Sequence, residues 1–536
     1  MPGTGHGRPG PLQCQALATA DQDLFGVRLA CRPVARVPIL SGSRLLVVRV
    51  PAGGTAVRPP PPGEGIGDVR AAVRDALRFP LEGEPLEALV PRGGRATIVV
   101  EPPALPLPGV PGDPRRAAIE ATVAELERVG VALERQTLLV AGGLARRSGP
   151  HELELLVSPA FARRFSGRVE VHDVEREDLA EVGGARVNPS LVQTDTVVVV
   201  TAAETVVHGG PAALLAAAGP ETMRAATAAS LVEPAGSDAW RLGTSLEREL
   251  SRHVPLVGVS LTLNSPAFKG ALRGYPHDEG AIERLSRLPG RRAFALLPGV
   301  LRRRVLRSLP TELTTAAVFA GPPSVAHAEA LLRGVASRAA RVDEPFDAIC
   351  LGIPPSTPYL PREDPNPLLA AYLALGLMLR LWRETFPVTD GGSAILVHRF
   401  SRRFAHPTQQ PYRMFFQALR TIGSAEPDAL AEAEREAASD ARAIRSYREG
   451  QTCHPLLPFA DWAACRPALD RLGAVFVAGC RDSVAARQLG FVPAHGIGAA
   501  LTMAEGRAGR ALRTGFLVAP PYFPVQVSRA ASRSGS

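Results

Sequence analysis

Short apolar runs alternate with amphipathic stretches along this chain from Arg95 onward. Residues 95–100 (RATIVV) are rich in β-branched side chains and predict a strand. Residues 113–130 predict a helix, with Asp113 as its N-cap and Pro114 at its first position. Residues 136–143 (QTLLVAGG) predict the next strand, which ends on two glycines. A helix that joins two such strands predicts a parallel pair with a right-handed crossover.

The same order continues toward the C-terminal end. Residues 168–173 and 194–204 predict two more strands of a first domain, and residues 256–264 predict the strand that opens a second one. We therefore predict an α/β fold with two doubly wound parallel-sheet domains, residues 1–255 and 256–536, and a cleft between them. The charged stretch 426–451 predicts a solvated helical insertion in the second domain.

The excess of positive charge has a compositional explanation. The chain of 536 residues carries a formal net charge of +9, but its positive residues are scattered and nearly all are arginine. Lys269 is the only lysine. Scarce lysine beside abundant Ala, Arg, Gly and Pro is typical of a GC-rich genome. We expect no nucleic-acid partner, since no basic platform with interleaved aromatic residues supports one.

Other features of the sequence favour a cytoplasmic protein without a membrane partner. The longest apolar stretch, residues 367–382, is short for a membrane span and contains Arg380, so we interpret it as a core helix. The first residues hold Gly and Pro where a signal peptide needs an apolar segment. The six cysteines form no C-x-x-C pair, which predicts reduced and mostly buried thiols.

Four segments carry a resemblance to a known family: residues 76–100, 117–153, 169–183 and 476–520. The last of them contains the turn QLGFVPA with a helix and a strand behind it. Their order resembles that of the nickel-dependent lactate racemases. The resemblance implies a nickel-pincer nucleotide held between two α/β domains, and the racemisation or epimerisation of a 2-hydroxy acid.

Some positions depart from that family's site. Ala104, Leu105 and Pro106 stand where the family has a Thr-Arg-Pro motif, so Leu105 replaces its arginine, although Glu101 stands near the motif's acidic position. Ala145 replaces one of two proton-transfer histidines. The segment that should hold a cofactor-bearing lysine has Arg186 instead, which the resemblance implies as a non-covalent cofactor contact.

Other positions match the family and supply the candidate site. The resemblance implies that Gly142 and Gly143 contact the cofactor and that Arg146 orients a substrate carboxylate. His172 matches the second proton-transfer histidine, and an imidazole suits acid and base work near neutral pH. His208, before two glycines, matches a nickel ligand within about one position.

Two hypotheses for the function remain open. The first is a racemase or epimerase of a 2-hydroxy acid that binds the nickel-pincer nucleotide without a lysine link. Its second base would be His398 or His406, which are equally interpretable as surface histidines. The second is a catalytically silent paralogue, without the cofactor, that binds a small acid or a nucleotide. Both hypotheses expect His172 and His208 to face one crevice from adjoining strand ends, and both leave the oligomeric state open.

Overall fold

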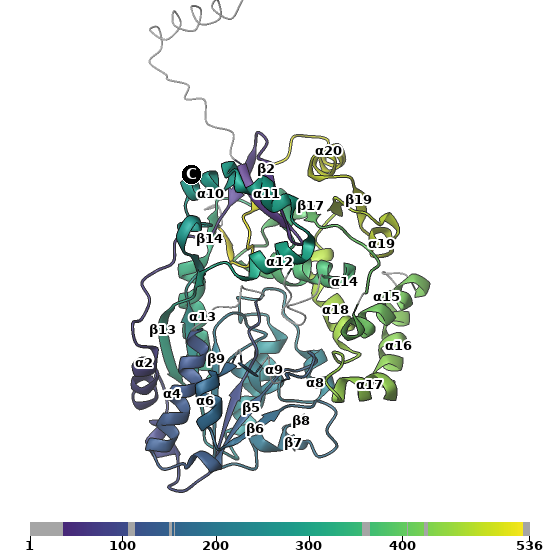
Figure 1. Cartoon of the computed structure of the whole chain (residues 1–536). Helices are drawn as coiled ribbons and strands as arrows, with labels where there is room; N and C mark the ends of the chain where they lie inside the picture. The colour runs from purple at the N-terminus through teal and green to yellow at the C-terminus, as the bar shows by residue number, and fades with distance from the viewer. Residues whose placement is uncertain are drawn as a thin grey trace, which may run out of the picture. The chain divides into compact units, whose positions relative to one another are not determined.

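Two six-stranded sheets organise the chain, which confirms the predicted α/β fold (Figure 1). The computed structural model describes residues 36–105, 113–149, 153–154, 156–355, 365–404, 406–422 and 427–528. The residues from Arg36 onward form one compact unit.

The first sheet contains the strands predicted from Arg95 onward. They are β4 (Ala96–Val100), β5 (Gln136–Val140), β6 (Arg168–Val171), β9 (Thr196–Ala202), β10 (Leu256–Leu263) and β13 (Thr315–Gly321). Their order is β13-β10-β9-β4-β5-β6, and all pairs are parallel except β10 with β13. β4 and β9 are buried along their whole length. Parallel sheets are covered on both faces, so their strands have continuous apolar sequences rather than alternating ones.

The helix predicted between the first two strands is α4 (Pro114–Arg128). The Asp113 side chain accepts a hydrogen bond from the Arg115 N–H, and Pro114 occupies the first turn, as the sequence predicts. This cap fixes where the helix begins, so the side chain of Arg115 starts at the end of the helix closest to the loop after β4.

The second sheet is parallel throughout. Its strands are β3 (Gly54–Val57), β15 (Phe346–Gly352), β17 (Val388–Val397), β18 (Ala474–Ala478), β19 (Val492–Ala494) and β20 (Thr514–Leu517). Their order is β19-β18-β17-β15-β20-β3.

The two sheets exchange strands across the boundary predicted at residue 255. β10 was expected to open the second sheet, but it pairs with β9 of the first, and β13 follows it there. β3, from the N-terminal part, pairs with β20 of the second sheet. The expected assignment of these strands to sheets is therefore wrong, although the division into domains stays a prediction. The reason is physical: a strand's sequence records its burial and not which neighbour it pairs with.

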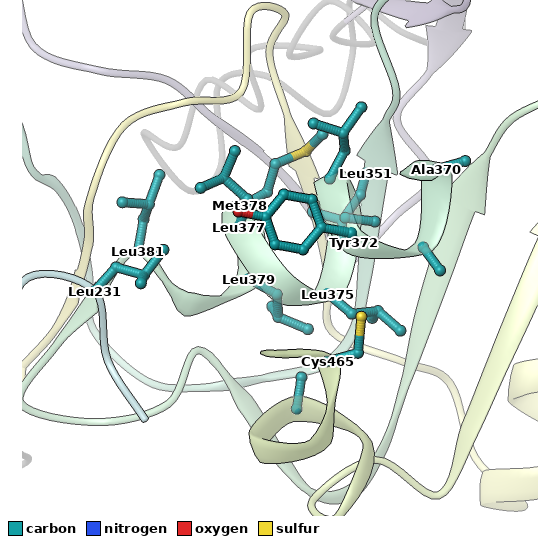
Figure 2. Packing of buried hydrophobic residues seen from close by; sticks show 14 of the residues in the cluster. Leu231, Leu351, Ala370, Tyr372, Leu375, Leu377, Met378, Leu379, Leu381 and Cys465 are labelled. Carbon is teal, nitrogen blue, oxygen red and sulfur yellow. The ribbon is translucent and has the colours of Figure 1, made fainter. Parts of the chain in front are cut away.

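The apolar stretch from residue 367 is a core helix, as predicted. It continues from α14 (Pro367–Ala371) through the π-helical turn η4 (Tyr372–Leu377) and the 3-10 turn η5 (Met378–Arg380), and all of it is buried. Figure 2 shows side chains of η4 and η5 packed together, with Cys465 of α18 (Leu457–Leu469) nearby. Among the described residues, we find no helix with the length and apolar character that a membrane crossing needs.

The charged stretch 426–451 is helical but only partly solvated. It forms α16 (Pro427–Ala438) and α17 (Ala441–Arg448). The exposed Arg442 and Arg445 agree with the prediction, but Tyr447 is fully buried. The described cysteines are free thiols, three of them buried, whereas Cys14 and Cys31 lie outside the described residues.

The remaining elements cover the sheets and connect them. They are β1 (Arg36–Ser41), β2 (Arg44–Arg49), α2 (Val69–Arg78), α3 (Leu86–Leu89), η1 (Leu133–Arg135), α6 (Pro159–Arg164), β7 (Ala180–Val182), β8 (Ala185–Val187), η2 (Pro189–Leu191), α7 (Pro211–Leu215), α8 (Pro220–Ala225), α9 (Asp238–Leu250), β11 (Ala267–Phe268), η3 (Gly270–Leu272), α10 (Glu279–Arg287), α11 (Gly290–Leu296), α12 (Gly299–Arg307), β12 (Thr311–Glu312), α13 (Pro323–Arg338), β14 (Ala340–Val342), β16 (Trp382–Arg383), η6 (Pro407–Gln409), α15 (Gln410–Ile422), α19 (Ser483–Gln488), α20 (Ile497–Ala508) and β21 (Val525–Val527).

Candidate functional site

Polar side chains gather at the carboxyl edge of the first sheet, where β4 and β9 end side by side. Glu101 follows β4 directly, and Glu204 lies just after β9. Arg115 reaches the same place from the first turn of α4. Ligands of parallel α/β sheets bind at this edge, because loops from neighbouring strands converge there.

Glu204 and Arg115 form a buried ion pair with further hydrogen bonds. Arg115 Nη1 lies 3.1 Å from Glu204 Oε2, which also accepts the N–H of Ala104 at 3.0 Å. Arg115 binds Asp113 through Nε and Nη2 as well. Burial alone would lower the pKa of Arg115, but the charges of Glu204 and Asp113 raise it above its usual value. Arg115 is therefore a permanently charged partner of two carboxylates.

One oxygen of Glu204 has no hydrogen-bond partner among the described residues. The residue is only 4% exposed, and its buried Oε1 has no hydrogen bond to any described group. Glu204 and Arg115 line a cavity of about 20 Å³ that Glu101 and His208 also border. Such a volume accommodates about one water-sized group.

Glu101 is held as a neutral acid at neutral pH. Its Oε2 accepts the N–H of Gly209 at 2.5 Å. Burial raises the pKa of Glu101 to about 8, against the lowering effect of the Gly209 N–H, and the charge of Glu204 adds to the increase. The site thus combines a protonated carboxyl group with a second carboxyl group that pairs with Arg115.

His208 lies at the same site, as a neutral imidazole. Its Nδ1 lies 3.3 Å from Thr205 Oγ1, and the residue remains partly exposed. Burial, and next the charge of Arg380, lower the pKa of His208 to about 4. The following Gly209 has a φ of +83°, and a Cβ there would lie 2.5 Å from His327 Cε1. Only glycine therefore permits this close approach of the loop to α13.

Both ring nitrogens of His172 form hydrogen bonds with other parts of the fold. Its Nε2 lies 3.0 Å from the Ala218 carbonyl oxygen, which can only accept, so Nε2 carries the proton. Its Nδ1 then accepts from the Asn188 amide at 3.1 Å. The residue is 2% exposed, and burial lowers the pKa of His172 to about 4. Its role in proton transfer stays a prediction, but the ring has no nitrogen left to offer a substrate in this arrangement.

His172 and His208 do not come from adjoining strands, so that expectation is wrong. His172 follows β6, and His208 follows β9, with β5 and β4 between them in the sheet. Three strand spacings correspond to roughly 14 Å across the sheet. The sequence placed both residues correctly after strands, but it could not supply the strand order.

The loop after β5 is covered by residues from the second half of the chain. The Tyr447 hydroxyl donates to the Gly143 carbonyl at 3.4 Å, and the His454 N–H donates to the Leu144 carbonyl at 3.0 Å. Arg146 Nη1 donates to the Gly450 carbonyl at 3.3 Å. The predicted substrate arginine thus holds the covering segment, residues 447–454.

The predicted cofactor contacts have local structural explanations. Gly143 has a φ of +51°, and a Cβ there would lie 2.7 Å from the Met223 methyl group of α8, whereas a Cβ at Gly142 would meet open space. Arg186 lies exposed on β8 and donates to the Arg176 carbonyl at 3.4 Å. Lys269 forms an ion pair with Glu312 at 3.3 Å, on β12. The contacts of Gly142, Gly143 and Arg186 with a cofactor remain predictions.

The described residues do not fit a nickel-pincer nucleotide. Leu105 stands where the resemblance expects a guanidinium, and no lysine lies near His172 in sequence. The donor set is instead two carboxyl groups, one guanidinium and a neutral imidazole.

The sequence-based prediction missed Glu204 and Arg115, although each carried a signal. Glu204 is an acidic residue directly behind a continuous apolar strand. Arg115 follows an Asp-Pro helix start, which places a cation where the helix N-terminus disfavours one.

Of the proposed second bases, His398 is buried against Phe400, with ring centroids 5.7 Å apart, and His406 caps η6 through Thr408.

Comparisons with known proteins agree with this fold. Residues 50–210 match the model of the lactate racemase N-terminal domain. The lactate racemase apoprotein from Thermoanaerobacterium thermosaccharolyticum is similar at 14% identity and a TM-score of 0.56, over 92% of this chain and 100% of that one. A protein from Thermotoga maritima aligns at 11% identity and a TM-score of 0.46, over 81% of this chain and 93% of that one. No curated protein matches the chain significantly. Residues 50–210 are therefore similar in sequence to the lactate racemase N-terminal domain, and the chain has the fold of a lactate racemase.

Proposed function

We propose that this protein binds a small hydroxy acid at the carboxyl edge of the first sheet, without nickel-pincer chemistry. The observation that carries the proposal is Glu204 Oε1, a buried carboxylate oxygen with no hydrogen-bond partner among the described groups. Leaving such an acceptor unpaired is costly, so a ligand that donates a hydrogen bond to it gains affinity. A hydroxyl group is the smallest donor that a hydroxy acid offers.

The charges around the cavity support an acid as the rest of the ligand. Arg380 is buried, and it donates to the carbonyl oxygens of Gly376, Ala228 and Ala229, whereas no described carboxylate forms an ion pair with it. Its charge reaches the site, because it contributes to the low pKa of His208. A buried cation without a counter-charge favours an anion nearby.

The size of the cavity favours a small acid over a nucleotide. Drug-sized ligands occupy pockets of roughly 300–1,000 Å³. The cavity beside Glu204 measures about 20 Å³, enough for a hydroxyl group but not for a base and a ribose. Only the hydroxyl end of the ligand would enter, next to the neutral carboxyl group of Glu101.

Lactate and propionate test this proposal, because they differ only by the hydroxyl group. By isothermal titration calorimetry, we expect lactate to bind about 10- to 100-fold more tightly, the effect of one hydrogen bond to a charged group. Glu204→Gln should remove most of the difference. Glu247→Gln, at a buried glutamate of α9 that binds Ser324, should preserve it. Equal binding of the two acids would refute the role of Glu204.

The racemase hypothesis makes the opposite prediction about metal. Protein purified from cells that also express the pincer biosynthesis enzymes should then contain stoichiometric nickel and absorb visible light, and His208→Ala should lose both. It should also racemise a 2-hydroxy acid other than lactate, and His172→Ala should abolish the turnover of any such substrate. We expect neither nickel nor conversion. Stoichiometric nickel in the wild type that His208→Ala removes would overturn our proposal.

A further inference from the structure

The helices α11 and α12 expose apolar side chains to an unusual extent. Leu296 is 86% exposed and Val300 is 68% exposed, while Leu301 and Val305 are 45% and 39% exposed. Leu301 and Val305 lie on one face of α12, since positions four apart share a helix side. A folded protein rarely presents such a group of large apolar residues unless the surface binds something.

The same segment is strongly basic. Residues 284–307 contain eight arginines and no aspartate or glutamate. α11 contacts β2, and α10 contacts β1, where Arg36 and Arg49 lie opposite each other in the hairpin. Figure 1 shows α10, α11, α12 and β2 gathered in one region. We call the exposed apolar residues of α11 and α12, with these arginines, the basic apolar surface.

A separate observation shows that the positive charges there are crowded. Burial, and next the charges of Arg302 and Arg481, lower the pKa of Arg44 at the start of β2. Arg302 donates to Ser43 Oγ at 3.3 Å and to the carbonyl oxygen of Leu297, so it ties α12 to the hairpin. The surface is therefore fixed by the fold, while its charges repel one another and favour an anionic partner.

We propose that the basic apolar surface docks on an anionic lipid membrane. Arginines attract acidic headgroups, and apolar side chains between them enter the boundary between headgroups and acyl chains. Nucleic acid would use the charges but would leave Leu296 and Val300 exposed to water. The proposal departs from the sequence-based expectation of no membrane partner, because that expectation considered membrane-spanning segments. It is independent of the hydroxy-acid proposal.

Vesicle flotation tests the docking with pure lipids. The full chain should float with vesicles of phosphatidylcholine mixed with phosphatidylglycerol, and not with phosphatidylcholine alone. High salt should weaken the binding, because it screens surface charges. The double variant Arg292→Glu with Arg304→Glu should weaken partitioning at least about twenty-fold, since each basic residue near an anionic surface contributes about fivefold. Both residues are exposed.

Matched variants separate docking from general charge and from misfolding. Arg442→Glu with Arg445→Glu, on α17, changes the net charge equally and should preserve binding. Leu296→Ser should weaken binding several-fold, whereas Leu332→Ser, at a 51% exposed leucine of α13, should not. Either of two results would overturn the proposal: no flotation with anionic vesicles, or an equal loss of binding in the two arginine double variants. It would also be overturned if the chain bound duplex DNA and Leu296→Ser changed neither DNA binding nor vesicle binding.

Discussion

Replacing Glu101 by glutamine should change how the stability of the protein depends on pH. Burial raises the pKa of Glu101 from 4.5 to about 8 in the folded state. Above the lower value, an unfolded chain ionises this carboxyl group while the folded chain keeps it protonated. The folded state then binds more protons, so wild-type stability falls as the pH rises between these two values. Glutamine keeps an oxygen for the Gly209 N–H but does not titrate.

The size of the effect follows from the two pKa values. One unit of pKa difference corresponds to about 1.4 kcal/mol. Between about pH 5 and pH 8, a shift from 4.5 to 8 removes at most about 3.5 kcal/mol of unfolding free energy. Glu101 keeps partial exposure to solvent, which weakens such effects, so we expect about half of that maximum.

Urea denaturation at several pH values measures this difference. Glu101→Gln should match the wild type near pH 5 and become more stable than it by about 2 kcal/mol near pH 8. Glu432→Gln, at an exposed glutamate of α16, should follow the wild type throughout. Parallel curves for Glu101→Gln and the wild type would refute the claim that burial keeps this carboxyl group protonated.

Three further substitutions test other parts of the structure. His172→Ala should lower the unfolding free energy by about 2–4 kcal/mol, because it removes buried packing and leaves one N–H of the Asn188 amide and the Ala218 carbonyl without this partner, and urea denaturation would detect this loss. Tyr447→Phe removes the hydroxyl that binds the loop after β5, so we expect a loss of about 1 kcal/mol in the same assay. Burial raises the pKa of Asp461 to about 8 against its hydrogen bond from Tyr412. Asp461→Asn should therefore equal the wild type near pH 4 and exceed its thermal stability at neutral pH; equal melting temperatures at neutral pH would contradict this.

The strands of the first sheet were predictable because burial leaves a local record. Residues 96–100 and 196–202 are continuous apolar runs, and both are buried strands in the structure. The cap at Asp113 was equally local, since one side chain and the next turn decide it. The partner of each strand was not predictable, and β10 illustrates the point, because its apolar sequence suits either sheet.

The candidate site divides in the same way. Glycine positions such as Gly143 and Gly209 could be recognised from the sequence as places where the chain turns. Their reasons lie elsewhere in the chain, since Met223 and His327 occupy the space that a Cβ would need. Likewise, the stretch 426–451 looks solvated because it is rich in charged residues, but Tyr447 is buried against a loop some 304 positions away.

The sequence by itself determined the α/β class, the resemblance to the lactate racemases and the residues missing from that family's site, because these depend on residue types and on their order along the chain. Only the tertiary structure decided which polar groups meet. It separated His172 from His208 by two strands and brought Glu101, Glu204 and Arg115 together. The physical reason is that the pKa of a carboxyl group and the partners of an imidazole depend on burial and on neighbours distant in the chain, which no local pattern records.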